Sequence, residues 1–145
     1  MTSEILKKIV HLLLPLIQVF AIYVVLFGHL SPGGGFAGGT ILGTSFIIDR
    51  FVNGELHMKS KINQKHAIQM VGWSLFIYAF IKGTTFILPG VGIHVKLPLG
   101  TPGRIFSGGL ILPLNILVGI IVALTFYLIV ALFDEGEEKH ENAID

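Results

Sequence analysis

The sequence predicts an all-α membrane protein with four transmembrane helices and both termini in the cytoplasm. Hydrophobic residues make up 52% of the chain and charged residues 13%, with a mean hydropathy of +0.79. Soluble domains carry about 25% charged residues, so this composition indicates a protein of the bilayer. Two further observations support the prediction: the apolar residues gather in long runs, and most basic residues flank alternate ends of those runs.

Four apolar segments are long enough, or nearly so, to cross a bilayer, which takes about 20 residues of helix. Because no water satisfies backbone groups in the hydrocarbon core, each segment is predicted to be helical. The predicted spans are residues 5–27, 35–51, 66–88 and 107–133, and an acidic tail follows at 134–145. Together they form a single integral membrane domain, residues 1–145.

The basic residues predict how the spans are oriented. With four spans, both termini and the middle loop share one side of the membrane, where seven basic residues collect: Lys7, Lys8, Arg50, Lys59, Lys61, Lys65 and Lys139. The opposite side receives Lys96 and Arg104. The positive-inside rule therefore places both termini in the cytoplasm, and the expected location is the cell membrane.

The stretch GHLSPGGGFAGGTILG, residues 28–43, differs from the apolar runs around it because seven of its sixteen residues are glycine. Gly35, Gly39 and Gly43 are four residues apart and share one helix face, which another backbone can approach closely. Pro32 fixes the backbone just before this helix. Two interpretations remain: a turn that starts a tightly packed helix, or a bent entry that faces an ion path.

A weak internal repeat links the two connections on the outer side. SPGGGFAGGTIL at residues 31–42 and TPGRIFSGGLIL at residues 101–112 share the pattern P-G-x-x-F-x-G-G-x-I-L. A parallel duplication of a two-helix hairpin would explain the repeat, as in other membrane transporters. The first and third helices do not align at the same offset, so the duplication stays open.

Charged residues within a predicted span are costly and tend to be functional, and Lys82 and Asp49 are the two candidates considered. Lys82 lies about 9 Å inside the outer end of the third span, so it either faces other helices or a hydrated cavity, or extends toward the headgroups. A desolvated lysine can exchange protons, as a relay requires. Asp49, at the inner end of the second span, is either an interfacial anchor or an entry point for protons or cations. Lys82 and Asp49 are therefore the candidate residues of an ion pathway.

Few cofactors fit this composition. The absence of cysteine excludes disulfides, thiolate zinc sites and iron–sulfur clusters. Paired histidines in a four-helix membrane bundle can hold b-type haem, and the histidines considered are His11 and His66 near the inner face, and His29 and His94 near the outer face. These positions are at or beyond helix ends, so no cofactor is expected. No catalytic or metal-binding set appears either, and the acidic tail predicts a solvated end without nucleic-acid binding.

At GHLSPGGGFAGG the sequence resembles the MnhB (MrpB) family, the small B subunit of multisubunit Na+/H+ antiporters, and related domains of membrane-bound hydrogenase-type complexes. Four spans and a chain of this length agree with that family, so the resemblance covers nearly the whole protein. The residues that carry the motif are Gly28, His29, Pro32, Gly33, Gly34, Gly35, Phe36 and Gly38.

The resemblance implies a small structural or pathway-lining subunit of a cation/proton antiporter, with no enzymatic activity of its own. Its partners would be the large antiporter-like subunits, which carry most of the ion-translocating residues in that family, and the other small membrane subunits. The alternative host is a ferredoxin-linked respiratory complex of the membrane-bound hydrogenase or sulfur reductase type. An independent haem-binding four-helix protein is the remaining alternative.

Overall fold

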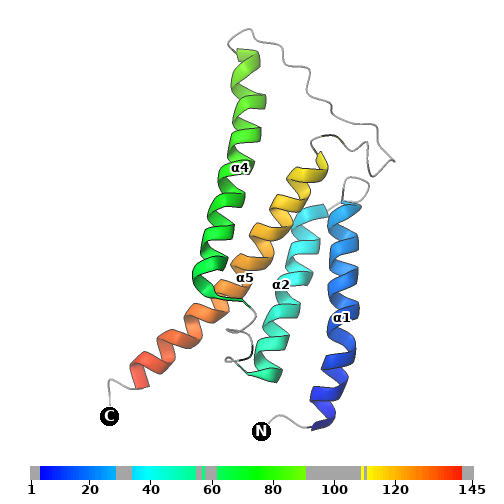
Figure 1. Ribbon diagram of the computed structural model, residues 1–145, viewed down its shortest axis with the longest axis vertical. Coiled ribbons are helices and arrows are strands. Elements are labelled where there is room, and N and C mark those ends of the chain that lie inside the picture. The colour runs from blue at the N-terminus through cyan, green and yellow to red at the C-terminus, as the bar shows by residue number, and fades with distance from the viewer. Residues whose placement is uncertain are drawn as a thin grey trace.

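The computed structural model describes residues 4–28, 34–54, 57, 62–90, 109 and 111–141, and in these residues it contains long helices and no strand (Figure 1). The helices are α1 (Glu4–Leu26), α2 (Gly34–Asn53), α4 (Gln64–Gly90) and α5 (Ile111–Glu141). The all-α fold class predicted from the sequence is therefore confirmed for the described part of the chain.

Residues at the helix ends explain where the helices begin and end. The Asn63 side chain accepts a hydrogen bond from the Lys65 backbone N–H at 3.0 Å, which satisfies a free donor in the first turn of α4. Gly54, with a φ of 89°, follows α2 and donates its N–H to the Arg50 carbonyl at 3.0 Å. This left-handed glycine is a common way to end a helix. Pro113 lies in the first turn of α5, where a missing N–H costs no helical hydrogen bond.

The first three helices begin and end within a few residues of the predicted spans, but the last one differs. The prediction placed its start at residue 107, whereas α5 begins at Ile111. The apolar span within it ends at Asp134, one residue from the predicted 133, and the helix continues through Glu141 into the predicted acidic tail at 134–145. Glutamate and lysine are good helix formers, so the polar sequence extends the helix beyond the apolar run.

Three of the described helices, α1, α4 and α5, are long and apolar enough to cross a membrane. The second helix has the required length, but five glycines and the pair Asp49 and Arg50 reduce its apolar character. That α2 also crosses the membrane, and that the termini are cytoplasmic, stay predictions.

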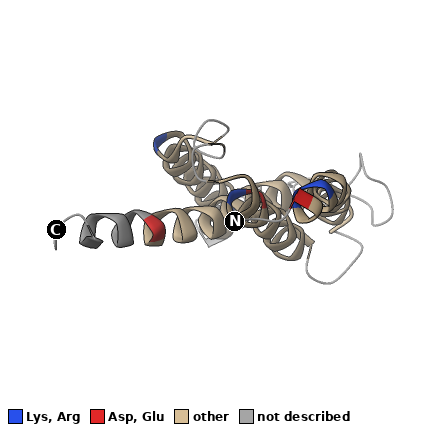
Figure 2. Ribbon diagram, turned by 90° about the horizontal axis from the view of Figure 1, so that it is seen from below, with Lys and Arg blue, Asp and Glu red and all other residues tan. Residues whose placement is uncertain are grey.

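The second helix packs between α1 and α5, and α4 contacts the bundle through α5 (Figure 1). The start of α1, the end of α2 and the start of α4 lie at the same end of the bundle, which we call the terminal end. From there α4 diverges from α5 toward the opposite end (Figure 1). Seen from the terminal end, charged residues occupy only a few positions on helices that are otherwise uncharged (Figure 2).

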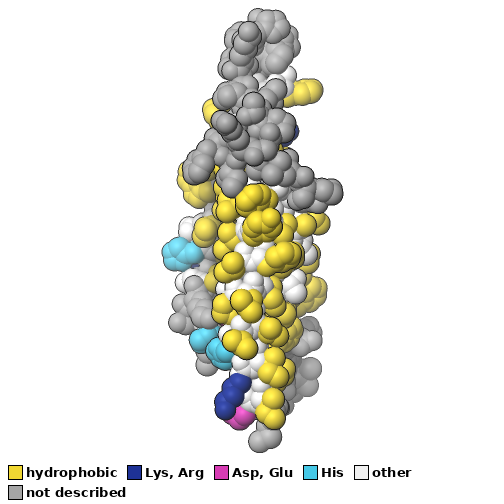
Figure 3. Space-filling model, turned by 90° about the vertical axis from the view of Figure 1, so that its right-hand side faces the viewer, with side chains coloured by type: hydrophobic (Ala, Val, Ile, Leu, Met, Phe, Trp, Pro, Cys, Tyr) yellow, Lys and Arg dark blue, Asp and Glu magenta, His cyan; other side chains and the backbone are white. Residues whose placement is uncertain are grey.

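The buried core is small. One cluster joins α4 to α5 and consists of Ala67, Leu124, Tyr127, Leu128 and Ala131. A second joins α1 to α2 and consists of Val10, Leu14 and Val52. Many large apolar side chains point outward instead, and they cover the face of the molecule around α1 (Figure 3). Outward apolar side chains of this kind are covered by lipid or by other membrane helices.

Candidate functional site

Glycines on α2 let three helices approach one another closely. A Cβ atom added at Gly38 would lie 2.8 Å from the Ala21 carbonyl oxygen of α1. On the side of α5, a Cβ at Gly39 would lie 2.7 Å from the Gly119 carbonyl oxygen, and a Cβ at Gly43 2.9 Å from that of Ala123. Both distances are shorter than real Cβ contacts allow, so only glycine fits at this spacing. The glycines of α2 thus allow close backbone packing against both α1 and α5.

The motif that carries the family resemblance lies where α1 ends and α2 begins. Gly34 has a φ of 35°, and a side chain at Gly28 would meet its backbone. A side chain at Gly35 would meet the Asn115 backbone of α5. The ring of Phe36 points away from the bundle and is 61% exposed. The remaining motif residues, His29, Pro32 and Gly33, lie outside the described residues, as do residues 101–108 and 110 of the internal repeat.

A cluster of polar side chains lies at the other end of α2. Asp49 is 4% exposed and Arg50 is 2% exposed, although both are charged. The Nε of Arg50 donates to Oδ2 of Asp134 at 2.8 Å, which ties α2 to α5. The Arg50 guanidinium also lies 6.0 Å from the centre of the Tyr127 ring, within the range of a cation–π contact. Asp134, which the sequence assigned to the solvated tail, is therefore a contact between helices.

Asp49 belongs to a chain of hydrogen bonds that reaches α1. Nδ2 of Asn53 donates to Oδ1 of Asp49 at 2.5 Å, and Oδ1 of Asn53 lies 3.1 Å from Nε2 of His11. His11 is exposed, so this series of hydrogen bonds joins an accessible imidazole to a buried carboxylate. Whether Asp49 is an interfacial anchor or an entry point for protons or cations stays a prediction. The contact between Asp49 and Asn53 was not predicted from the sequence, although the two residues are four apart and so share one helix face.

Lys82 is exposed on α4, in the part of that helix that diverges from α5. It is not enclosed by other helices of the described chain. Within the described part of the chain it makes no ion pair. Thr84 and Thr85 beside it donate their hydroxyls to the Ile81 carbonyl, at 2.9 and 2.7 Å, so these hydroxyls are satisfied on their own helix. The structure therefore keeps Lys82 apart from Asp49 and from its cluster.

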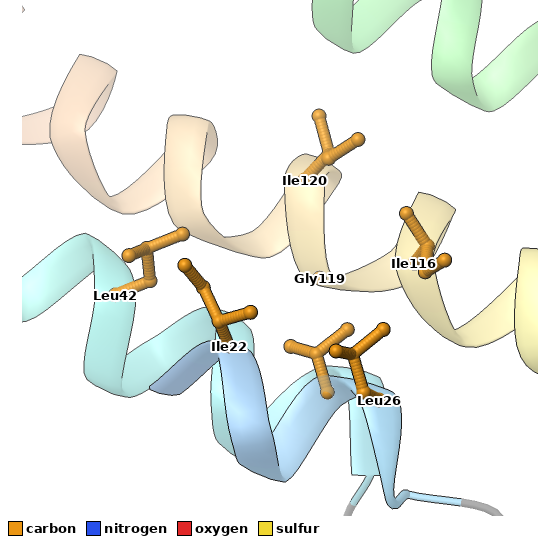
Figure 4. A pocket seen from close by; sticks show the side chains of 7 residues that line it. Ile22, Leu26, Leu42, Ile116, Gly119 and Ile120 are labelled. Atoms are coloured by element: carbon orange, nitrogen blue, oxygen red, sulfur yellow. The ribbon is translucent and has the colours of Figure 1, made fainter. Parts of the chain in front are cut away.

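A groove between α1, α2 and α5 has a volume of about 200 Å³ (Figure 4). Its lining is apolar throughout: Ile22, Val25, Leu26, Leu42, Ile116, Gly119 and Ile120. A site for an ion or a polar substrate needs convergent polar groups, which this lining does not supply. The groove is thus a packing feature of the three-helix core.

Of the four histidines considered for haem, His11 and His66 are described, and neither points to a haem site in the bundle core. His11 contacts Asn53, and His66 is exposed in the first turns of α4. His29 and His94 lie outside the described residues. Among the residues that the structure describes, no group of three or more histidine, cysteine, aspartate and glutamate side chains could hold a metal ion.

The fold and these contacts define a helical protein of membrane-spanning character in which Asp49 and Arg50 are buried where α2 packs against its neighbours. A sequence profile described as "Domain related to MnhB subunit of Na+/H+ antiporter" matches residues 5–128. The chain therefore belongs to this family, as its motif predicts. Membership supports a subunit of a complex of the Na+/H+ antiporter type.

One curated relative is the uncharacterized protein MJ1307 of Methanocaldococcus jannaschii, which is 30% identical over 110 residues. The alignment covers 72% of this chain, but the chain spans only 42% of the length of that relative. No solved structure matches the chain.

Proposed function

We propose that this chain is a small structural subunit of a multisubunit Na+/H+ antiporter, and that Asp49 lies beside its ion pathway. The observation that carries the proposal is the family match over residues 5–128. Its partners are the large antiporter-like subunits and the other small membrane subunits. The complex lies in the cell membrane with the terminal end of this chain in the cytoplasm, in agreement with the basic residues at that end.

The structural role is supported by the close packing of α2. Helix association in lipid depends on van der Waals contact, because lipid tails are as apolar as the helices. The glycines of α2 provide such contact with α1 and α5. A rigid three-helix unit of this kind presents its outer faces to other subunits in a fixed arrangement.

The pathway role is supported by the two hydrogen bonds that link His11 to Asn53 and Asn53 to Asp49. Buried carboxylates within membrane helices are costly and are kept where protons or cations move. Here the exposed imidazole of His11 gives access to the buried carboxylate through Asn53. The arrangement lies at the terminal end, where protons or cations from the cytoplasm would enter.

The complex is tested by purification of a tagged chain from its native membranes in mild detergent. We expect the large antiporter-like subunits to copurify, and vesicles that contain the complex to move protons against Na+. Recovery of hydrogenase or ferredoxin-binding subunits would instead support the redox-linked host. A chain recovered without other subunits would contradict the proposal, and a Soret band in that sample would support the haem-binding alternative.

The pathway is tested by Asp49→Asn, which removes the charge but keeps an oxygen that accepts from Asn53. We expect the complex to assemble and to lose most of its Na+-driven proton movement, measured with a pH-sensitive dye in vesicles. Glu4→Gln is the matched control, because Glu4 is an exposed acid at the same end of the bundle. Equal transport by the Asp49→Asn complex and the control would leave Asp49 a purely structural role.

A further inference from the structure

If α4 spans the membrane, as its length and apolar composition allow, Lys82 lies within the hydrocarbon region. The 27 residues of α4 span about 40 Å at 1.5 Å per residue, more than the hydrocarbon core of about 30 Å. With α4 centred in the membrane, the Cα of Lys82 lies about 8 Å from the midplane, on the side away from the terminal end. A lone ammonium at this depth is costly, so it needs an opposite charge or access to water.

Among the residues that the structure describes, no acidic side chain lies at that level. The sequence contains no aspartate or glutamate between residues 56 and 133, nor between residues 5 and 48. Glu4, Asp49 and Asp134 lie toward the terminal end of the bundle, because they are at the start of α1, the end of α2 and the distal part of α5. The other acidic residues are Glu55, just after α2, and those that follow Asp134 in the sequence.

From this charge distribution we propose that Lys82 pairs with a carboxylate on a transmembrane helix of another subunit, and that α4 is a surface on which this helix docks. The inference rests on the proposed function, because it requires a complex. A carboxylate in the same half of the membrane neutralises the ammonium, and their attraction is strong in the low dielectric of the bilayer.

The exposure of α4 supports a protein neighbour over lipid. Only 6% of its span is buried in this chain, against 22% for α1 and 28% for α5, although α4 is the least apolar of the three. A helix surrounded by lipid should be the most apolar one. In addition, a Cβ atom added at Gly83, next to Lys82, would meet nothing within 4 Å, and neither would one at Gly72. A neighbouring backbone therefore has room to approach α4 closely.

The pair is tested by carbodiimide crosslinking of the purified complex. The reagent activates a carboxylate, the amine of a nearby lysine attacks it, and an amide forms as the urea by-product leaves. We expect mass spectrometry to find Lys82 joined to an aspartate or glutamate of another subunit. Lys82→Arg should keep the complex intact and abolish this crosslink, because the guanidinium keeps the charge but does not form the amide.

The contribution of the pair is tested by Lys82→Met, which removes the charge and keeps an unbranched apolar chain. We expect recovery of the partner subunit after detergent washing to fall by about tenfold or more, because its carboxylate is left unpaired. Lys65→Met is the control, since Lys65 is exposed near the start of α4. It should leave the recovery unchanged.

Two results would overturn the inference while the proposed function stands. One is a complex of normal yield with Lys82→Met and no crosslink at Lys82 in the unmodified protein, which would mean that Lys82 extends to lipid headgroups. The other is a crosslink from Lys82 to this chain itself. Purification of the unmodified chain without partners would instead contradict the proposed function, and the inference with it.

Discussion

The helices α2 and α4 contain similar residues that differ in their contacts with the rest of the chain. Both contain glycines within an apolar sequence, but the glycines of α2 contact α1 and α5, whereas Gly72 and Gly83 of α4 face open space. Both also carry charged residues. Arg50 of α2 pairs with Asp134 of this chain, while Lys82 of α4 pairs with none of its described residues. The comparison teaches that α2 is packed on two sides by helices of this chain, whereas most of the α4 surface is left open by the described residues.

The largest effect is expected from Gly39→Leu on α2. The Cβ alone would lie 2.7 Å from the Gly119 carbonyl oxygen, and the rest of the side chain would force α2 away from α5. Overpacking of a core costs about 1–3 kcal/mol, and a clash with backbone should reach the upper end of this range or exceed it. We expect loss of the monodisperse peak in size-exclusion chromatography after mild heating in detergent.

Gly72→Leu on α4 is the matched control for this substitution. A Cβ at Gly72 meets nothing within 4 Å, so the isolated chain should keep the stability of the unmodified protein. If Gly72→Leu destabilised the isolated chain as much as Gly39→Leu, the contrast between the two helices would be wrong. If the Gly72→Leu chain were stable on its own but assembled poorly, the result would support a contact of α4 with another subunit.

The helices were predictable from the sequence because long apolar runs in a bilayer have few alternatives to helix. The limits of α5 were less predictable. Its start depends on Pro113 in the first turn, and its polar end at Glu141 carries no apolar signal that separates helix from tail. The four-residue spacing of the glycines placed Gly35, Gly39 and Gly43 on one face, but it did not show that α5 is the helix they meet.

The polar cluster was only partly predictable. Asp49 was recognised as a candidate from its place at the end of a span, but its burial depends on how α2 packs against two other helices. The partner of Arg50 lies eighty-four residues away, at Asp134. A pattern within one helix carries no information about such a distant contact. Lys82 was identified because a charge inside an apolar run is visible in the sequence itself.

A smaller effect is expected from Arg50→Met, which removes the ion pair between α2 and α5. Arg50 is 2% exposed and Asp134 38%, so the cost lies between that of a surface pair and that of a fully buried pair. We expect a loss of about 1–3 kcal/mol in the free energy of unfolding, measured by denaturant titration in detergent. Unchanged stability would mean that packing alone holds the terminal ends of α2 and α5 together.

Asp134→Asn separates the charge of this pair from its hydrogen bond. The amide oxygen still accepts from Nε of Arg50, so the stability should lie between those of the unmodified chain and Arg50→Met. Stability equal to that of Arg50→Met would show that charge, and not hydrogen bonding, supplies the contribution of the pair.

The smallest effect is expected from Tyr127→Phe, at the point where α4 is attached to the bundle. Tyr127 is fully buried, and its hydroxyl donates to the Ile62 carbonyl at 3.3 Å, just before α4 begins. Loss of one such hydrogen bond costs about 0.5–1.5 kcal/mol, and its length favours the lower value. Hydrogen exchange of the amides in the first turns of α4 should accelerate, while Tyr23→Phe, at an exposed tyrosine of α1, should leave it unchanged.

This substitution also distinguishes what holds α4 in the isolated chain from what holds it in the complex. In the isolated chain α4 is attached through α5, so the loss of the Tyr127 hydroxyl acts directly on its exchange rate. In the complex, a partner helix on the exposed face of α4 would supply contacts that do not involve Tyr127. The acceleration should therefore be smaller in the complex than in the isolated chain, whereas equal acceleration in both would mean that α4 gains no support from a partner.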